Sequence, residues 1–186
     1  HSDFTLYLSE GWNWVSHNLN SPISVQSLPD EATRVVGFRN EAFHDGKAGM
    51  VGDLQSLGAG HLYKIQMASS YYYRNEGELY SSKNPIPLKP GWNWIGYTPN
   101  GAQTVTNALS GNLLEDGDII VGQDGFSTYD NGVWSGTLTT LETGKGYMYK
   151  TYNAKSISFN TPDVTVNYSK ARSRSRYTSK YNKHAY

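Results

Sequence analysis

The stretch Gly11-Trp12-Asn13-Trp14-Val15 recurs in the second half of the chain as Gly91-Trp92-Asn93-Trp94-Ile95, and similar sequence follows each copy. The later blocks match in the same order: Val35-Val36-Gly37 with Ile120-Val121-Gly122, residues 52–57 with 136–141, and Leu62-Tyr63-Lys64 with Met148-Tyr149-Lys150. Several matching blocks in one order indicate an internal duplication. The chain therefore contains two copies of one structural unit.

Each copy starts like a β-hairpin. An apolar run at residues 4–8 or 86–88 leads into a Gly-containing turn, and the strand with the Trp-Asn-Trp motif follows. Residues 21–25 and 104–109 begin with cap-like Ser or Thr, which predicts one or two helical turns in each copy. Later in the second copy, Asp130-Asn131-Gly132 predicts a tight hairpin, because Asn and Gly both accept positive φ.

The repeat predicts a mainly β fold: an internally duplicated antiparallel β module of two pseudo-symmetric units with short helical turns. The first unit spans residues 1–83 and the second 84–160, and either one body or two small lobes fits the pattern. Residues 161–186 have no place in the repeat and carry six basic residues among Ser and Tyr. A linker or the start of a following domain is favoured there over contact with nucleic acid or an acidic glycan.

The composition excludes several classes of protein. Sixteen basic and sixteen acidic residues cancel, so no net charge draws the chain to nucleic acid or to an anionic membrane. No apolar run approaches the roughly 20 residues of a membrane span, so membrane insertion is not expected. The chain has no cysteine, which excludes disulfides and thiolate chemistry. A neutral partner and contacts with neighbouring domains of the same chain are expected.

The second copy carries further motifs around the hairpin and at its last strand, namely Asp118-Ile119-Ile120, Trp134-Ser135-Gly136 and residues 144–149 (Gly-Lys-Gly-Tyr-Met-Tyr). With Gly-Trp-Asn-Trp, these motifs resemble repeat modules of large multimodular Bacteroidetes proteins. The resemblance covers about residues 4–160 and implies a secreted or cell-surface location. In the first copy Met50 aligns with Trp134, and His61 stands where the second copy has Tyr147.

Catalytic chemistry is not expected in this chain. A glycosidase needs two carboxylates at a fixed separation, and the candidates lie mostly in predicted turns, where acidic residues are common for local reasons. These candidates are Glu115, Asp116, Asp118, Asp124 and Asp130. The five His residues form no zinc motif. No cofactor is expected, although the four Asp residues leave calcium open as an alternative.

The aromatic residues are the remaining candidates for function. Trp12 with Trp14, and Trp92 with Trp94, each share one face of a strand. Because both copies carry the pair in the same setting, packing in the core is favoured over sugar stacking. Positions where the copies differ are more informative. They single out Tyr72 as an outward ring between Tyr71 and Tyr73, which are expected to point inward, and they single out a platform of Phe126, Tyr129 and Trp134.

These observations predict a non-catalytic carbohydrate-binding module of an extracellular protein, which binds polysaccharide through exposed aromatic rings. The candidate binding residues are Trp134, Tyr129, Phe126, Tyr72, Trp92 and Trp94. The alternative is a structural or adhesive spacer without a small-molecule ligand, in which all the aromatic rings belong to the core.

Overall fold

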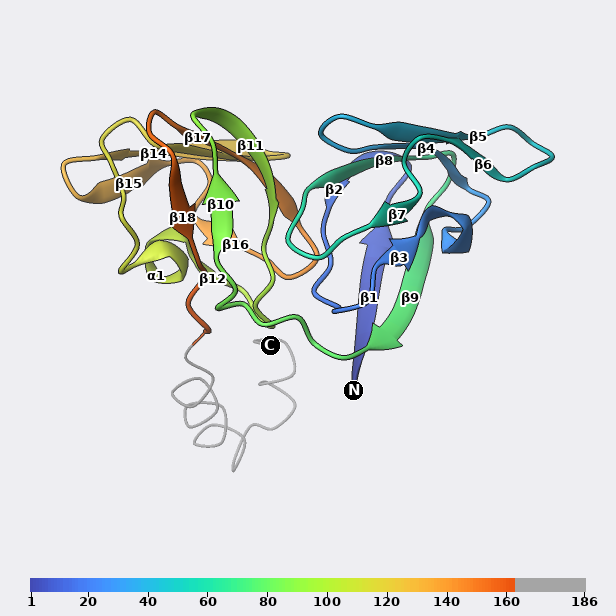
Figure 1. Cartoon of the computed structure of the whole chain (residues 1–186), viewed down its shortest axis with the longest axis horizontal. Helices are drawn as coiled ribbons and strands as arrows, with labels where there is room; N and C mark the ends of the chain where they lie inside the picture. The colour runs from blue at the N-terminus through green and yellow to red at the C-terminus, as the bar shows by residue number, and fades with distance from the viewer. Residues whose placement is uncertain (163–186) are drawn as a thin grey trace, which may run out of the picture.

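The computed structural model describes residues 1–162 and is mainly β, with two similar halves side by side (Figure 1). The strands of the first half are β1 (Ser2–Leu8), β2 (Gly11–Val15), β3 (Ile23–Ser24), β4 (Ala32–Val36), β5 (Glu41–His44), β6 (Met50–Gly52), β7 (Ser56–Leu57), β8 (Tyr63–Met67) and β9 (Tyr71–Gly77). A short 3-10 helix, η1 (Val25–Ser27), follows β3.

The second half repeats this series. Its strands are β10 (Ile86–Leu88), β11 (Gly91–Gly96), β12 (Gln103–Thr104), β13 (Ile119–Gly122), β14 (Gly125–Asp130), β15 (Val133–Gly136), β16 (Thr140–Leu141), β17 (Gly146–Thr151) and β18 (Lys155–Ile157). The helix α1 (Val105–Leu109) takes the place of η1, and the Thr104 side chain caps it by accepting a hydrogen bond from Asn107 N.

The two halves have the same topology. Each has a five-stranded antiparallel sheet, in the order β2-β8-β4-β5-β6 or β11-β17-β13-β14-β15. Each also has two strand pairs, β1–β9 and β3–β7 in the first half, and β10–β18 and β12–β16 in the second. The predicted fold class, a duplicated antiparallel β module with short helical turns, is therefore confirmed. The β14–β15 hairpin turns through Asn131 and Gly132, both at positive φ (51° and 80°), as predicted.

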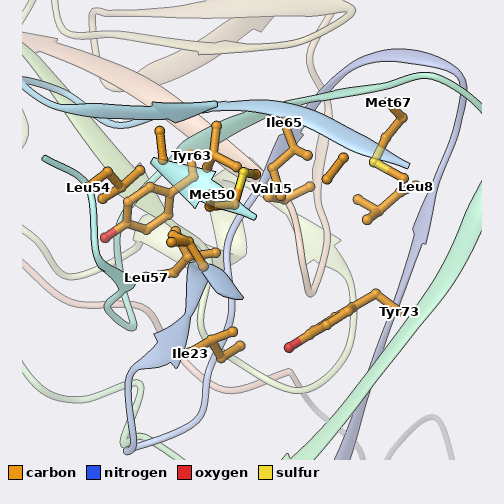
Figure 2. Packing of buried hydrophobic residues seen from close by; sticks show 14 residues of the cluster. Leu8, Val15, Ile23, Met50, Leu54, Leu57, Tyr63, Ile65, Met67 and Tyr73 are labelled. Carbon is orange, nitrogen blue, oxygen red and sulfur yellow. The ribbon is translucent and has the colours of Figure 1, made fainter. Parts of the chain in front are cut away.

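Each half has its own hydrophobic core beneath its five-stranded sheet. In the first half, Val15, Ile65 and Val35 lie on the inner face of adjacent strands and are almost fully buried. Figure 2 shows Val15 and Ile65 facing Leu57 and Tyr73, which come from the smaller strand pairs. The second half buries an equivalent set, including Ile95, Ile120 and Tyr149, in a separate cluster. Of the two arrangements left open by the sequence, the molecule has two lobes.

Backbone hydrogen bonds with pseudo-twofold symmetry join the lobes. Ser16 N donates to Gly144 O at 2.9 Å, and Gly96 N donates to Gly60 O, also at 2.9 Å. The close approach depends on glycine on one side, because a Cβ on Gly96 would lie 2.5 Å from Ser16 Cβ. The edge strands β2 and β11 therefore meet at the middle of the molecule (Figure 1).

Strand register corrects the sequence alignment of the last two strands. Val15 pairs with Tyr63 and Ile95 pairs with Tyr147, and each tyrosine hydroxyl accepts a backbone N–H five residues earlier. Tyr63 therefore corresponds to Tyr147, two residues before the position assigned from sequence similarity. His61 consequently corresponds to Lys145, not to Tyr147. The match of Met50 with Trp134 holds, because they occupy equivalent positions in the β5–β6 and β14–β15 ladders.

Candidate functional site

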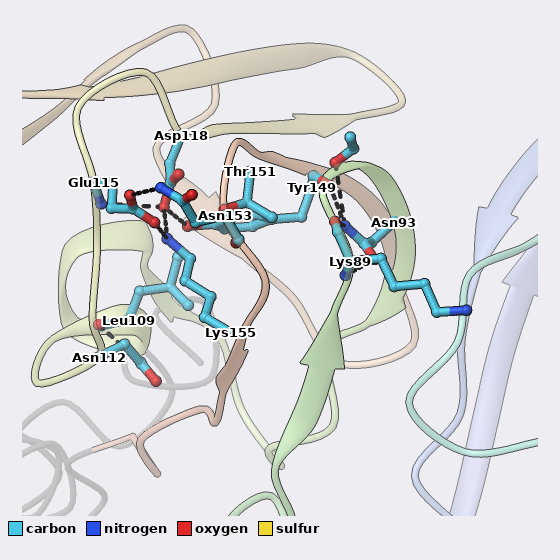
Figure 3. Close-up of polar contacts among 11 residues, drawn as sticks. Lys89, Asn93, Leu109, Asn112, Glu115, Asp118, Tyr149, Thr151, Asn153 and Lys155 are labelled. Carbon is cyan, nitrogen blue, oxygen red and sulfur yellow. Dashed lines mark hydrogen bonds and ion pairs between the residues drawn. The ribbon is translucent and has the colours of Figure 1, made fainter.

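The Asn of each Trp-Asn-Trp motif is the residue that faces inward. Asn13 Oδ1 accepts from Ser9 N at 2.9 Å, and Asn13 Nδ2 donates to Ser9 O at 2.8 Å. Asn93 makes the same pair of bonds to Lys89, each at 2.9 Å (Figure 3). The amide thus holds the turn before the strand. Because side chains alternate across a strand, both neighbouring Trp residues must point to the opposite, outer face.

The packing expected for the four Trp residues is therefore wrong. Trp12 and Trp92 are 39% and 40% exposed, and neither Trp14 nor Trp94 belongs to a core cluster. The inward position of the motif suits Asn, because its amide hydrogen-bonds to the backbone N–H and C=O groups of the turn. A Trp ring at this position would not make these bonds. What both copies share is the turn that the Asn holds, and the Trp rings consequently lie on the surface.

Further side chains extend this surface across each sheet, and in the second half all of them are apolar. In the second half, register places Trp94, Met148, Val121 and Phe126 in one row across four strands. Phe126 ends the row with 52% of its surface exposed. In the first half, the row that begins at Trp12 crosses Gln66 and Arg34. It ends at Phe43, which pairs with Arg34 and is 46% exposed. We call these two outer faces together the aromatic face.

The two parts of the aromatic face meet around one ammonium group. Lys64 Nζ lies 4.2 Å from the centre of the Trp14 ring and 4.6 Å from that of Trp94, so it bridges the two lobes by cation–π contacts. Burial lowers the pKa of Lys64. Phe38 packs edge-on against Trp94, with ring centres 5.9 Å apart. The equivalent of Lys64 in the second lobe is Met148.

Each lobe also extends a hairpin tip towards the other. Gln123, between β13 and β14, donates from Nε2 to Trp12 O at 2.7 Å and accepts from Trp14 N at 3.0 Å. Phe38, at the equivalent tip between β4 and β5, contacts Trp94 instead. These contacts fix the edge strands β2 and β11 and hence the positions of their Trp side chains.

Two quasi-equivalent hollows flank the junction, and their chemistry differs. One, of about 260 Å³, is lined by Phe38, Arg39, His61 and Trp94 among others. The other, of about 150 Å³, is lined by Trp14 with polar and charged side chains: Gln123, Asp124, Glu142 and Lys145. The aromatic face therefore presents one aromatic, basic hollow and one polar hollow with two carboxylates.

The candidate binding residues separate into three places. Trp92, Trp94 and Phe126 lie together on the aromatic face. Trp134 and Tyr129 pair on the opposite face of the same sheet, with ring centres 5.2 Å apart. Trp134 packs against the core of the second lobe, and its Nε1 is buried. The platform of Phe126, Tyr129 and Trp134 is thus not formed. Trp134 pairs with Tyr129, and Phe126 lies three residues before Tyr129, so its side chain points to the opposite face of the sheet.

Tyr72 is 69% exposed, as expected for an outward ring, but it lies on the β1–β9 pair and stacks on Tyr7 at 4.9 Å. Tyr71, expected to point inward, is 40% exposed. The residues missed by the sequence argument are Trp12, Trp14, Phe43 and Lys64. For Trp12 and Trp14 the signal was the Asn between them, which has a stronger reason to face inward than either ring.

The acidic candidates do not form a site on the aromatic face, apart from Asp124 at its edge. Asp116 accepts from Asn131 N at 2.9 Å and so serves the hairpin turn. Glu115 and Asp118 both contact Lys155 in the second lobe (Figure 3). Within residues 1–162, no three His, Cys, Asp or Glu side chains gather where they could hold a metal ion. No helix in this part of the chain could span a membrane.

Comparison with known proteins gives no relative. No family model, curated protein or solved structure matches this chain. The basic stretch within residues 161–186, predicted as a linker, lies beyond the described residues from 163 onward.

Proposed function

We propose that this chain is a non-catalytic carbohydrate-binding module of an extracellular protein, and that it binds polysaccharide on the aromatic face. The observation that carries the proposal is the exposure of Trp12 and Trp92, at 39% and 40%, on strands whose inward positions are already filled by Asn and aliphatic residues. Exposed Trp rings grouped on one face are unusual unless they meet a partner.

A sugar is the partner that this surface fits best. The flat C–H face of a pyranose stacks on an aromatic ring, and polar side chains beside the ring hydrogen-bond its hydroxyl groups. Trp12 has Gln66 beside it in the register, and Trp92 has Lys150, whose Nζ lies 5.8 Å from the ring centre. Both Trp residues thus combine a stacking surface with a hydrogen-bond donor.

The ligand is expected to be a chain of sugars. Trp94 and Phe126 are separated by β17 and β13, which places them about 14 Å apart at the usual spacing of strands. Together with the junction at Lys64, the rings form a surface longer than one sugar. The proposal contains no catalytic step. The carboxylates of Glu115 and Asp118 both contact Lys155, and they lie off the aromatic face.

Retention on insoluble polysaccharides, followed by calorimetry with soluble oligosaccharides, tests this function. Trp12→Ala and Trp92→Ala should weaken retention, and Tyr72→Ala should not, because Tyr72 is more exposed than either Trp but lies on another surface. Failure of the unmodified chain to bind any member of a broad polysaccharide panel would support the spacer instead.

A further inference from the structure

The second lobe buries a Lys residue against two carboxylates. Lys155 opens β18, and its Nζ contacts Asp118 Oδ2 directly and lies 3.4 Å from Glu115 Oε1 (Figure 3). The side chains of Lys155 and Asp118 are 3% and 0% exposed, and that of Glu115 is 31% exposed. The aromatic face and its proposed ligand make no use of this cluster.

The fold does not require the cluster. In the first lobe, Tyr71 occupies the position of Lys155, and Ile65 occupies that of Tyr149, the hydroxyl partner of Asp118. The first lobe thus builds the same strands without an equivalent of this buried ion pair, and its own Arg34–Glu41 pair is partly exposed. A buried ion pair is costly to desolvate and contributes little to stability when apolar residues can replace it. The presence of three ionisable groups in one lobe therefore points to chemistry.

We propose that Lys155 and Asp118 join in an intramolecular amide bond, with Glu115 as the proton carrier. The reaction starts from the neutral amine and the neutral carboxylic acid, which the transfer of one proton from Lys155 to Asp118 gives. Lys155 Nζ then attacks Asp118 Cγ. The new N–C bond forms, one C–O bond breaks, and the oxygen leaves as water with one proton from the acid and one that Glu115 carries from Nζ.

The contacts around Asp118 distinguish its two oxygens. Oδ2 accepts from the Tyr149 hydroxyl at 2.6 Å and from Glu115 N at 3.3 Å, so these donors polarise it as the carbonyl oxygen that remains. Oδ1 is buried and accepts no hydrogen bond from residues 1–162, so we assign it as the oxygen that leaves once it carries two protons.

Glu115 is held where a proton carrier is needed. Its Oε2 accepts from Asn153 Nδ2 at 2.6 Å, which leaves Oε1 facing Lys155 Nζ. Its partial exposure gives the released water and the protons a route to solvent. Burial of Lys155 and Asp118 protects the product, since hydrolysis of the amide needs water at the same carbon.

The bond would cross-link β18, the last strand of the second lobe, to the segment before β13. Residues 118 and 155 are 37 positions apart, so the cross-link would close a loop and restrict the unfolded chain, as a disulfide does. A chain without cysteine would gain in this way a covalent restraint that reducing agents do not remove.

Intact mass spectrometry of the denatured chain is the test. The expected mass is below the sequence mass by one water, and tryptic digestion should give a branched peptide joining residues 118 and 155, with no cleavage after Lys155. Glu115→Gln and Lys155→Arg should each restore the full sequence mass. The full sequence mass together with cleavage after Lys155 in the unmodified chain would overturn the proposal without touching the proposed sugar binding.

Discussion

Lys64 Nζ lies 4.2 Å from the Trp14 ring of its own lobe and 4.6 Å from the Trp94 ring of the other, so one ammonium joins the two copies of the repeat. It also stands at the centre of the aromatic face. We therefore expect Lys64 to contribute both to the stability of the junction and to binding of the proposed sugar ligand.

Lys64→Met places at the junction the residue that the second lobe has there, Met148. We expect the variant to fold and to lose about 1 kcal/mol from the cation–π contacts. Sugar binding should weaken by roughly tenfold, the usual value of a hydrogen bond from a charged donor. Calorimetry measures the affinity, and Lys83→Met, at an exposed Lys away from the aromatic face, is the matched control. Equal effects of the two variants would argue against a special position for Lys64.

Asn13→Ala removes the amide that holds the turn before β2. Ser9 N and Ser9 O lose their partners at a site where Asn13 is 7% exposed. We expect a loss of about 2 kcal/mol in the free energy of unfolding, measured by urea denaturation. Asn13→Asp keeps the acceptor for Ser9 N but not the donor, so an intermediate loss is expected. An alanine variant as stable as the parent would show that the turn does not need the amide.

Trp134→Ala and Phe126→Ala should have opposite effects. Trp134 packs on the core, so its removal should cost roughly 3 kcal/mol of stability and leave sugar affinity intact below the melting transition. Phe126 is exposed on the aromatic face, so its removal should leave stability within about 0.5 kcal/mol and reduce affinity. Thermal melts and calorimetry on both variants give the comparison, and a loss of affinity confined to Trp134→Ala would refute the assignment of faces.

His17 makes stability depend on pH. Its Nε2 donates to Leu57 O at 2.6 Å and its Nδ1 accepts from Leu19 N at 3.2 Å, so the buried ring is neutral. Burial lowers the pKa of His17 below its ordinary 6.5. The unfolded chain then binds the proton more readily, so stability is complete above pH 6.5 and falls as pH decreases through the window below it.

His17→Tyr introduces the residue found at the same place in the second lobe, Tyr97. As pH falls from 7.5 to 5, the parent should lose unfolding free energy relative to the variant. The loss should be about 1 kcal/mol for each unit by which folding lowers the pKa of His17. A pH-independent difference would mean that His17 takes up its proton equally well in the folded chain.

The repeat in the sequence predicted the fold, because turn and strand signals around Gly11 and Gly91 are local and occur twice. Orientation of the Trp residues was predicted wrongly, because alternation along a strand defines two faces but does not tell which is inner. The hydrogen bonds of Asn13 to the turn decide which face is the inner one, and these bonds depend on backbone positions that the alternation pattern does not define. Lys64 and Lys155 were missed because their partners come from distant parts of the chain.

The most direct test of the binding proposal is calorimetry with an oligosaccharide from a retained polysaccharide, titrated into the parent chain and into a Trp12→Ala/Trp92→Ala double variant. Both rings lie on the aromatic face and outside the cores, so the variant should melt at nearly the parent temperature and bind at least tenfold more weakly. Unchanged affinity in a folded double variant would contradict binding on this face.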